Sequence, residues 1–327
     1  MLTPTCLLTI SLLAQSATAA PIFRFETGEF WLNLHHFLYV LGRAEAKTTD
    51  SARQAVAGAP ADEASGLAGL TDDERTRWRE AVHFYASGLS RKDLIFDDPL
   101  PAETSALADA RDAPTLAAAN LDGALRTTLE RVAPLYRRVW WPAHRAANNA
   151  WQTSTQALVD RYGRAVLAFI TRAYMMEWPA GGYPVHVAAY ANWAGAYSTS
   201  GNLLVVSSLD PGTHGAEGLE TVFHEGMHQW DTPVNDLLWA HADAIGKRVA
   251  PNLSHAMIFF TAGEAVRHVL PDHVPSAEAL GVWGRGWTRL RAALEETWKP
   301  YLDGRGTRDA ALDALVKLTA IEKSRPR

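Results

Sequence analysis

The segment from Phe30 to Leu41, FWLNLHHFLYVL, constrains the fold most strongly, because as a helix it is apolar on nearly every side. A surface helix shows one apolar and one polar face, so this helix is predicted to be buried. Glu29, Asn33 and His36 lie at positions i, i+4 and i+7 and form a polar line along it. This line could border a cleft, but we expect it to satisfy buried polar partners. Other elements must therefore fold around this helix.

Helical patterns fill most of the chain, and strand patterns occur only in its middle. Thr71 followed by Glu74 predicts a capping box at a helix start, whereas Ala55 to Gly69, rich in Ala, Gly and Pro, predicts a surface loop. Strands are expected at Tyr183–Tyr190 and Leu203–Ser208, and further helices at 116–132, 145–176, 216–230, 234–249, 256–269, 277–298 and 308–322. These patterns predict an α+β fold that is predominantly α-helical and has one small β-sheet.

The first twenty residues have the pattern of a secretory signal peptide. A short apolar run, Leu7 to Leu13, precedes the small-residue sequence Ala17-Thr18-Ala19, although no Lys or Arg precedes the run. A buried N-terminal helix is the alternative. We expect residues 1–19 to be a signal peptide and the protein to be secreted or periplasmic.

The rest of the chain, 20–327, is expected to form one domain, with a helical N-terminal part (20–180) and a catalytic part (181–327). Cys6 is the only cysteine, so a chain without the signal peptide would have no disulfide and would bind any metal through His or carboxylate groups. No segment after residue 20 has the length and apolarity of a membrane span.

The charge of the chain argues against a nucleic-acid partner. Its 31 basic and 36 acidic residues give a formal net charge of -5, and no block of Lys or Arg offers a track for phosphates. Nothing in the sequence predicts an oligomeric state.

The sequence His224-Glu225-Gly226-Met227-His228 lies within the helix expected at 216–230. Residues four apart project from the same face of a helix, so His224 and His228 can each place an imidazole nitrogen about 2 Å from one metal ion. Glu225 is rotated to the side of this pair, where it can take a proton from water and pass it to a leaving group. The spacing predicts two zinc ligands and a general base, and two ordinary buried histidines are the alternative.

Two stretches of the chain resemble the zincin peptidases, and more loosely their gluzincin branch: LLVVSSLDPGTHGAEGLETVFHEGMHQWD and SHAMIFFTAGEAVRH. The resemblance covers about residues 183 to 270. It implies a zincin-like core in which an edge strand lies beside the cleft, the helix with the His-Glu pair follows, and a later helix brings the third ligand. Leu203–Ser208 would then be the edge strand, and its backbone could pair with an extended peptide.

The third ligand has several candidates downstream of His228: Asp231, Asp236, His241, Asp243, His255 and Glu264. The metzincin pattern fails, because Asp231 and Val234 occupy the positions of its glycine and histidine. Asp231 is better suited to support a ligand histidine through a hydrogen bond.

Glu264 is the preferred third ligand, and His255 is the alternative. Glu264 lies mid-helix in an apolar stretch where an unpaired carboxylate would be costly to bury, and gluzincins use a glutamate on a later helix in this way. A salt bridge from Glu264 to Arg267 or His268 is the competing interpretation. His255 could instead donate a hydrogen bond to a developing oxyanion, a role for which Tyr190, Tyr197 and Tyr301 are rivals.

The sequence therefore predicts a zinc metallopeptidase that acts on a peptide or protein substrate. His224, His228 and Glu264 would bind Zn2+, Glu225 would activate water, and His255 would assist catalysis. One alternative is a zinc hydrolase with a non-peptide substrate, and another is a catalytically inactive zincin-fold binding protein.

Overall fold

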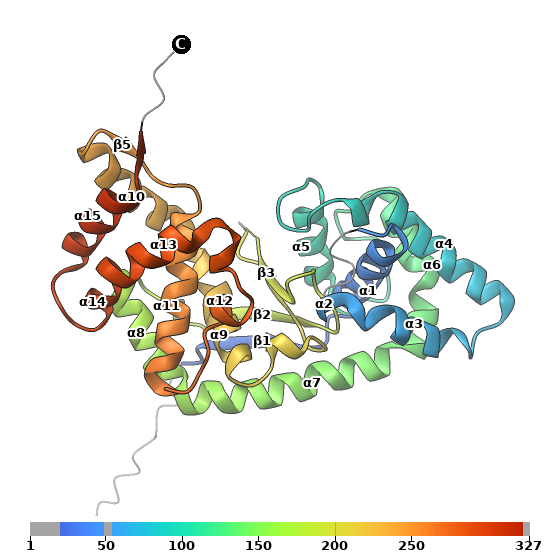
Figure 1. Ribbon diagram of the computed structural model, residues 1–327. Coiled ribbons are helices and arrows are strands. Elements are labelled where there is room, and N and C mark those ends of the chain that lie inside the picture. Colours follow the sequence, from blue (N-terminus) through green and yellow to red (C-terminus); the bar gives the residue numbers. More distant parts are fainter. Residues whose placement is uncertain (1–19, 49–53, 200, 323–327) are drawn as a thin grey trace, which may run out of the picture.

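The structure is a computed structural model that describes residues 20–48, 54–199 and 201–322. The predicted signal peptide, residues 1–19, lies outside this part of the chain. Figure 1 shows two groups of helices with a small β-sheet between them, and the long helix α7 (Trp141–Leu158) runs past both groups. The predicted α+β class with a predominance of helix is confirmed. Within the described residues, no helix combines the length and apolarity that crossing a membrane requires.

Helices before the second strand are α1 (Phe30–Glu45), α2 (Gln54–Ala57), α3 (Ala59–Leu67), α4 (Asp72–Ser87), α5 (Leu100–Ala110), α6 (Gly123–Val139), α7 and α8 (Arg164–Tyr174). Those after the sheet are α9 (Gly215–Met227), α10 (Asp231–Ala244), α11 (Leu253–Val269), α12 (Ser276–Ala279), α13 (Thr288–Ala293), α14 (Lys299–Leu302) and α15 (Arg308–Thr319). The predicted capping box is present at the start of α4, where Thr71 and Glu74 each accept a hydrogen bond from the other's backbone N–H.

The main sheet has the strand order β1-β2-β4-β3, made by β1 (Phe23–Glu26), β2 (Tyr183–Ala188), β4 (Leu204–Ser207) and β3 (Ala196–Ser198). β1, β2 and β4 are parallel, and β3 is antiparallel to β4. The prediction that Leu203–Ser208 is the edge strand is wrong, because β4 pairs with a strand on each side and β3 occupies the edge. A separate two-stranded sheet joins β5 (Lys247–Arg248) to β6 (Ile321–Glu322).

Helices cover both faces of the main sheet. Leu204 and Val206 of β4 belong to a hydrophobic cluster with residues of α8, α9 and α11, whereas Val205 belongs to a second cluster with residues of α1, α4 and α6. This division follows from the strand geometry, since successive side chains point to opposite faces. β1 pairs with β2, so the parts 20–180 and 181–327 share one sheet.

Helix α1 is buried from Phe30 to Gly42, as the sequence predicts. Its polar line contacts the sheet: Glu29 lies 2.8 Å from His186 Nδ1, and His36 Nε2 lies 2.9 Å from the Tyr197 hydroxyl. Asn33 donates to the Val187 carbonyl and accepts from the Ala189 amide. The line therefore satisfies buried partners and fixes α1 against the sheet.

The loop predicted at Ala55–Gly69 is wrong, because this stretch forms α2 and α3. The Asp62 carboxylate of α3 lies 2.6 Å from His144 Nε2 and accepts a hydrogen bond from the Tyr190 hydroxyl at 3.2 Å. The prediction gave Gly and Pro too much weight, because alanine has the highest helix propensity and Pro60 lies in the first turn of α3, where proline is tolerated.

Substitution of Asn148, a buried residue of α7, tests the polar connection between helix and sheet. Its amide donates to Asn33 Oδ1 and to the Val187 carbonyl, both at 3.1 Å, and its carbonyl accepts from the Ser208 hydroxyl at 2.6 Å. Asn148→Ala should lower the free energy of unfolding by about 2–3 kcal/mol in urea denaturation, because buried groups lose partners. The exposed neighbour Asn149 supplies the control, and Asn149→Ala should change it by less than about 0.5 kcal/mol. Equal losses of unfolding free energy in the two variants would contradict a stabilising role for the hydrogen bonds of Asn148.

Candidate metal centre

Three histidines from two helices converge on one point. His224 lies in the last turn of α9, His228 is the first residue after that helix, and His255 lies in the first turn of α11. One nitrogen of each imidazole lies within 4.8 Å of the others. The ring centroids are 5.0–5.5 Å apart. This group could hold a metal ion, since three imidazoles are a common ligand set of catalytic metal sites.

Close packing at Gly226 positions the histidines of α9. A Cβ atom at Gly226 would lie 2.4 Å from the Trp178 ring, so the helix reaches its position only because this residue has no side chain. Trp178 also packs edge-on against Trp230, in the turn after His228, at 5.7 Å. The central glycine of the motif is thus required by packing.

A second contact joins the middle of α9 to the segment that follows α11. The Glu220 carboxylate lies 2.5 Å from His273 Nε2 and accepts a hydrogen bond from the Ser276 amide at 2.9 Å. Glu220 and His273 are both buried. Gly263 of α11 faces Pro275, in the loop that leads from α11 to α12, where a Cβ atom at Gly263 would approach Pro275 to 2.6 Å. These contacts hold the two helices that carry the histidines in one arrangement.

The hydrogen bonds of the imidazoles fit metal binding. His228 Nδ1 lies 2.9 Å from the Asp231 carboxylate, as expected for a residue that supports a ligand histidine. This contact leaves Nε2 of His228 for a metal. His224 Nδ1 is buried and has no hydrogen-bond partner among the described residues. Buried polar atoms normally have partners, and an unpaired imidazole nitrogen of a buried histidine is compatible with metal binding by this side chain.

The electrostatics keep two of the three imidazoles neutral, the form that binds metals. Burial, together with the neighbouring histidines, holds the pKa of His224 well below its usual range. Burial and His228 lower the pKa of His255 to about 4. Burial also disfavours the charged form of His228, but its contact with Asp231 and the charge of Glu225 raise the pKa overall. Asp231 and Glu225 thus place negative charge where a bound cation would be.

Glu225 lies beside this group and is 9% exposed. Burial raises the pKa of its carboxyl group, against the opposing effects of His228 and of a hydrogen bond from Ser198. In the structure the Ser198 hydroxyl donates its hydrogen bond to the backbone carbonyl of Glu225 at 2.9 Å. Ser198 is the last residue of β3, so the edge strand touches the predicted general base.

Glu264 does not join the histidines, and the preference for it as the third ligand is corrected. Its carboxylate lies 3.2 Å from Arg267 Nη1 and 2.8 Å from Lys299 Nζ. Glu264 follows His255 by nine residues on α11, which rotates it by about half a turn and moves it about 13 Å along the axis. His255 is therefore the third member of the group, and the salt bridge considered for Glu264 is present.

The predicted oxyanion donors do not reach the site. Tyr190 donates to Asp62, Tyr197 contacts His36, and Tyr301 donates to the carbonyls of Arg172 and Ala173. Four residues that border the site were not predicted, because none belongs to a spaced motif. Phe259 and Trp287 contact the histidines, whereas Trp178 packs against Gly226 and Ser198 contacts Glu225.

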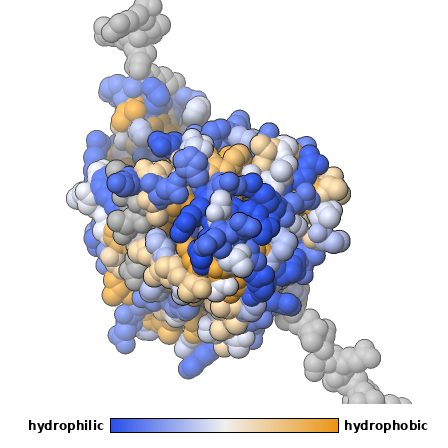
Figure 2. Space-filling model, turned by 90° about the vertical axis from the view of Figure 1, so that its right-hand side faces the viewer, coloured by the Kyte–Doolittle hydropathy of each residue, from blue (hydrophilic) through white to orange (hydrophobic). Residues whose placement is uncertain are grey.

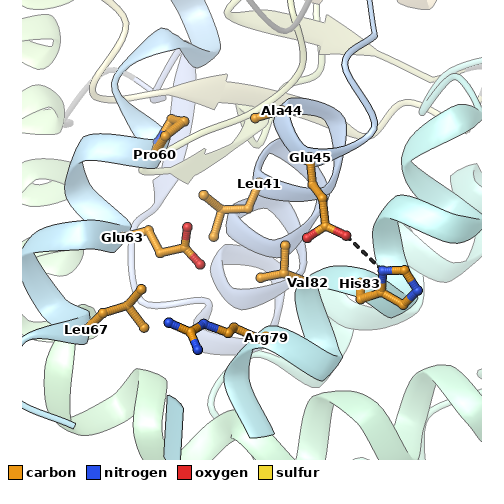
Figure 3. A pocket seen from close by; sticks show the side chains of 9 residues that line it. All are labelled: Leu41, Ala44, Glu45, Pro60, Glu63, Leu67, Arg79, Val82 and His83. Atoms are coloured by element: carbon orange, nitrogen blue, oxygen red, sulfur yellow. Dashed lines mark hydrogen bonds and ion pairs between the residues drawn. The ribbon is translucent and has the colours of Figure 1, made fainter. Parts of the chain in front are cut away.

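A cavity of about 690 Å³ lies elsewhere, between α1, α3 and α4. Figure 2 shows the face of the molecule on this side, where hydrophilic residues surround smaller hydrophobic areas. In Figure 3, the apolar side chains of Leu41 and Val82 lie among the charged side chains that line the cavity. Glu45 already pairs with His83, and Glu63 accepts a hydrogen bond from the Trp78 indole. We therefore place the candidate site at the histidines and not in this cavity.

Gly226→Ala tests the packing at the motif. Alanine favours a helix by about 1 kcal/mol over glycine, but overpacking against Trp178 costs more, and the free energy of unfolding should fall by about 1–3 kcal/mol. Gly123→Ala, in the first turn of α6 where a Cβ would meet no atom within 4 Å, is the control and should be neutral or stabilising. A stabilised Gly226→Ala protein in chemical denaturation would contradict the close contact.

The identity of the third ligand can be tested by metal titration of two variants. Loss of His255 should weaken Zn2+ binding by more than about 100-fold, because 10–100-fold is typical even of residues that only orient a ligand. Glu264→Gln should bind Zn2+ within a few-fold of the unmodified protein. Competition with a chromophoric chelator measures both affinities. A larger loss in Glu264→Gln than in His255→Ala would restore Glu264 as the ligand.

Comparisons of this chain with models of protein families, with curated proteins and with solved structures found no match. The function is therefore argued from the site alone.

Proposed function

We propose that this protein is a zinc-dependent hydrolase that cleaves peptide bonds. The observation that carries the proposal is the buried carboxylate of Glu225 beside three converging imidazoles. A structural zinc site needs four protein ligands and no neighbouring base, whereas catalytic sites have three protein ligands and keep one position open.

The donor set supports zinc as the metal. All three candidate ligands are imidazoles, which suit Zn2+. Cys6, which lies outside the described residues, is the only cysteine, so no cysteine of the described chain can supply a thiolate. When bound, zinc supplies Lewis acidity toward a carbonyl oxygen and lowers the pKa of water.

Glu225 would accept the proton of the attacking water and transfer it to the leaving amine. Its burial suits this role, because a raised pKa brings a carboxyl group closer to neutral pH and favours both proton transfers. Ser198 and the backbone of β3 would hold Glu225 in position. His255 is a ligand in this proposal, so the oxyanion is left without an assigned donor from the described residues.

The edge strand supports a peptide as substrate. β3 pairs with β4 through Ala196, Tyr197 and Ser198, and no strand of the described chain pairs with its other side. An extended peptide can add to such an edge through backbone hydrogen bonds. Since Ser198 contacts Glu225, a peptide paired with β3 would pass close to the predicted base. A non-peptide substrate would make no use of this edge.

Glu225→Gln tests the proposal. The variant should bind zinc as the unmodified protein does, because Glu225 is no ligand, but should cleave peptides at least about 100-fold more slowly, since a positioned acid–base group contributes about 10²–10⁴-fold. Digestion of a peptide mixture followed by mass spectrometry measures cleavage. Glu217→Gln, two turns earlier on α9 and only partly buried, is the control and should retain full activity.

Full activity of Glu225→Gln would exclude Glu225 as the base. If the zinc-loaded protein hydrolyses an ester or another non-peptide bond and no peptide, the substrate is of another class. If it binds zinc and hydrolyses neither, the protein is a binding protein with this site.

A further inference from the structure

Two partly buried aromatic side chains, Phe259 and Trp287, stand beside the three histidines. The Phe259 ring centroid lies 4.1 Å from that of His224 and 4.8 Å from that of His255. The Trp287 ring lies 5.5 Å from His255 and 6.1 Å from Phe259. The two rings and His255 thus form one continuous aromatic surface at the candidate metal centre.

We propose that Phe259 and Trp287 form the wall of a substrate subsite that selects an aromatic or large aliphatic side chain next to the scissile bond. This inference rests on the proposed function, since it names the substrates that the site would prefer. It assigns different tasks to the two rings. Phe259 packs against two candidate ligands and holds them, whereas Trp287 contacts His255 alone among the histidines and is the determinant of specificity.

The distances allow a substrate side chain to reach this wall. Consecutive Cα atoms of a peptide lie about 3.8 Å apart, so the side chains flanking a carbonyl at the histidines stay within about one ring width of them. Trp287 lies at that distance from His255. A side chain of the substrate can therefore pack on the indole while the adjacent peptide bond lies at the histidines.

The local backbone leaves space beside Trp287. The residue ends the stretch Trp283–Trp287, in which Gly284, Arg285 and Gly286 are exposed. A Cβ atom at Gly284 or Gly286 would meet no atom within 4 Å, and Gly286 has φ +92, a conformation that L side chains rarely adopt. Two residues without side chains thus precede the indole, which keeps the approach to it open.

The chemistry of the wall predicts the preferred ligand. Covering a half-buried apolar ring with another apolar group lowers the free energy, because it removes apolar surface from water. A pair of aromatic rings is stabilised further, by more than the buried area alone accounts for. A hydrophobic subsite typically discriminates between side chains by about 10- to 200-fold. Peptides with Phe, Tyr, Trp or Leu beside the cleaved bond should therefore react faster than the same peptides with Ala or Gly.

The test compares two metal-chelating probes, phenylacetohydroxamic acid and acetohydroxamic acid, by titration calorimetry on the zinc-loaded protein. Both carry the same chelating group, and only the first carries a ring. The unmodified protein should bind the phenyl probe at least about 10-fold more tightly, and Trp287→Ala should reduce this preference to less than about 3-fold. Trp287→Phe should restore most of it.

Trp239→Ala is the matched control, since Trp239 lies on α10 and is 64% exposed, and this variant should keep the full preference. The same variants are compared for cleavage of a Phe-containing peptide and its Ala counterpart. No binding of either probe, or a preference that survives in Trp287→Ala, overturns the proposed wall. A Trp287-dependent preference without peptide cleavage supports the wall and overturns the proposed peptidase function.

Discussion

Helix α9 is buried from Gly218 to Met227, and each polar group on it must therefore find a partner in another element. The Glu220 carboxylate is paired with His273 and Ser276, and the backbone carbonyl of Glu225 accepts a hydrogen bond from Ser198 of β3. The arrangement of the site depends on this constraint, because the partners come from opposite sides of the helix. The segments that supply hydrogen-bond partners to the polar groups of α9 also border the proposed active site.

The N-terminal helices contribute to the site through the sheet. α1 and α7 are fixed to β2 by Asn33 and Asn148, whose amides meet at the Val187 carbonyl. β2 pairs with β4, and β4 pairs with β3, which carries Ser198. The N-terminal helices therefore stabilise one face of the sheet. The edge strand of that sheet lies beside Glu225, so these helices support the site indirectly. No residue of α1 or α7 belongs to the histidine group.

Local patterns predicted most of what depends on neighbours in sequence. The buried helix α1, the capping box of α4, the strand β2 and the helix with His224 and His228 were all predictable, because helix and strand periodicity is a local property. The errors concern contacts between distant segments. The contacts that position α3, from Asp62 to His144 and Tyr190, join segments far apart in sequence, and β3 was missed because three residues carry too little periodicity to identify a strand.

The sequence by itself determined two candidate ligands and a base, since residues four apart on one helix must share a face whatever surrounds them. The tertiary structure decided which downstream side chain lies beside these two histidines, and it is His255 rather than Glu264. Glu264 was preferred for its chemistry, but α11 turns that carboxylate toward Arg267 and Lys299 and turns His255 toward α9. The physical reason is that the phase of one helix relative to another is set by packing, here helped by the contacts of Glu220 on α9 with His273 and Ser276 after α11, and no pattern within either helix encodes it.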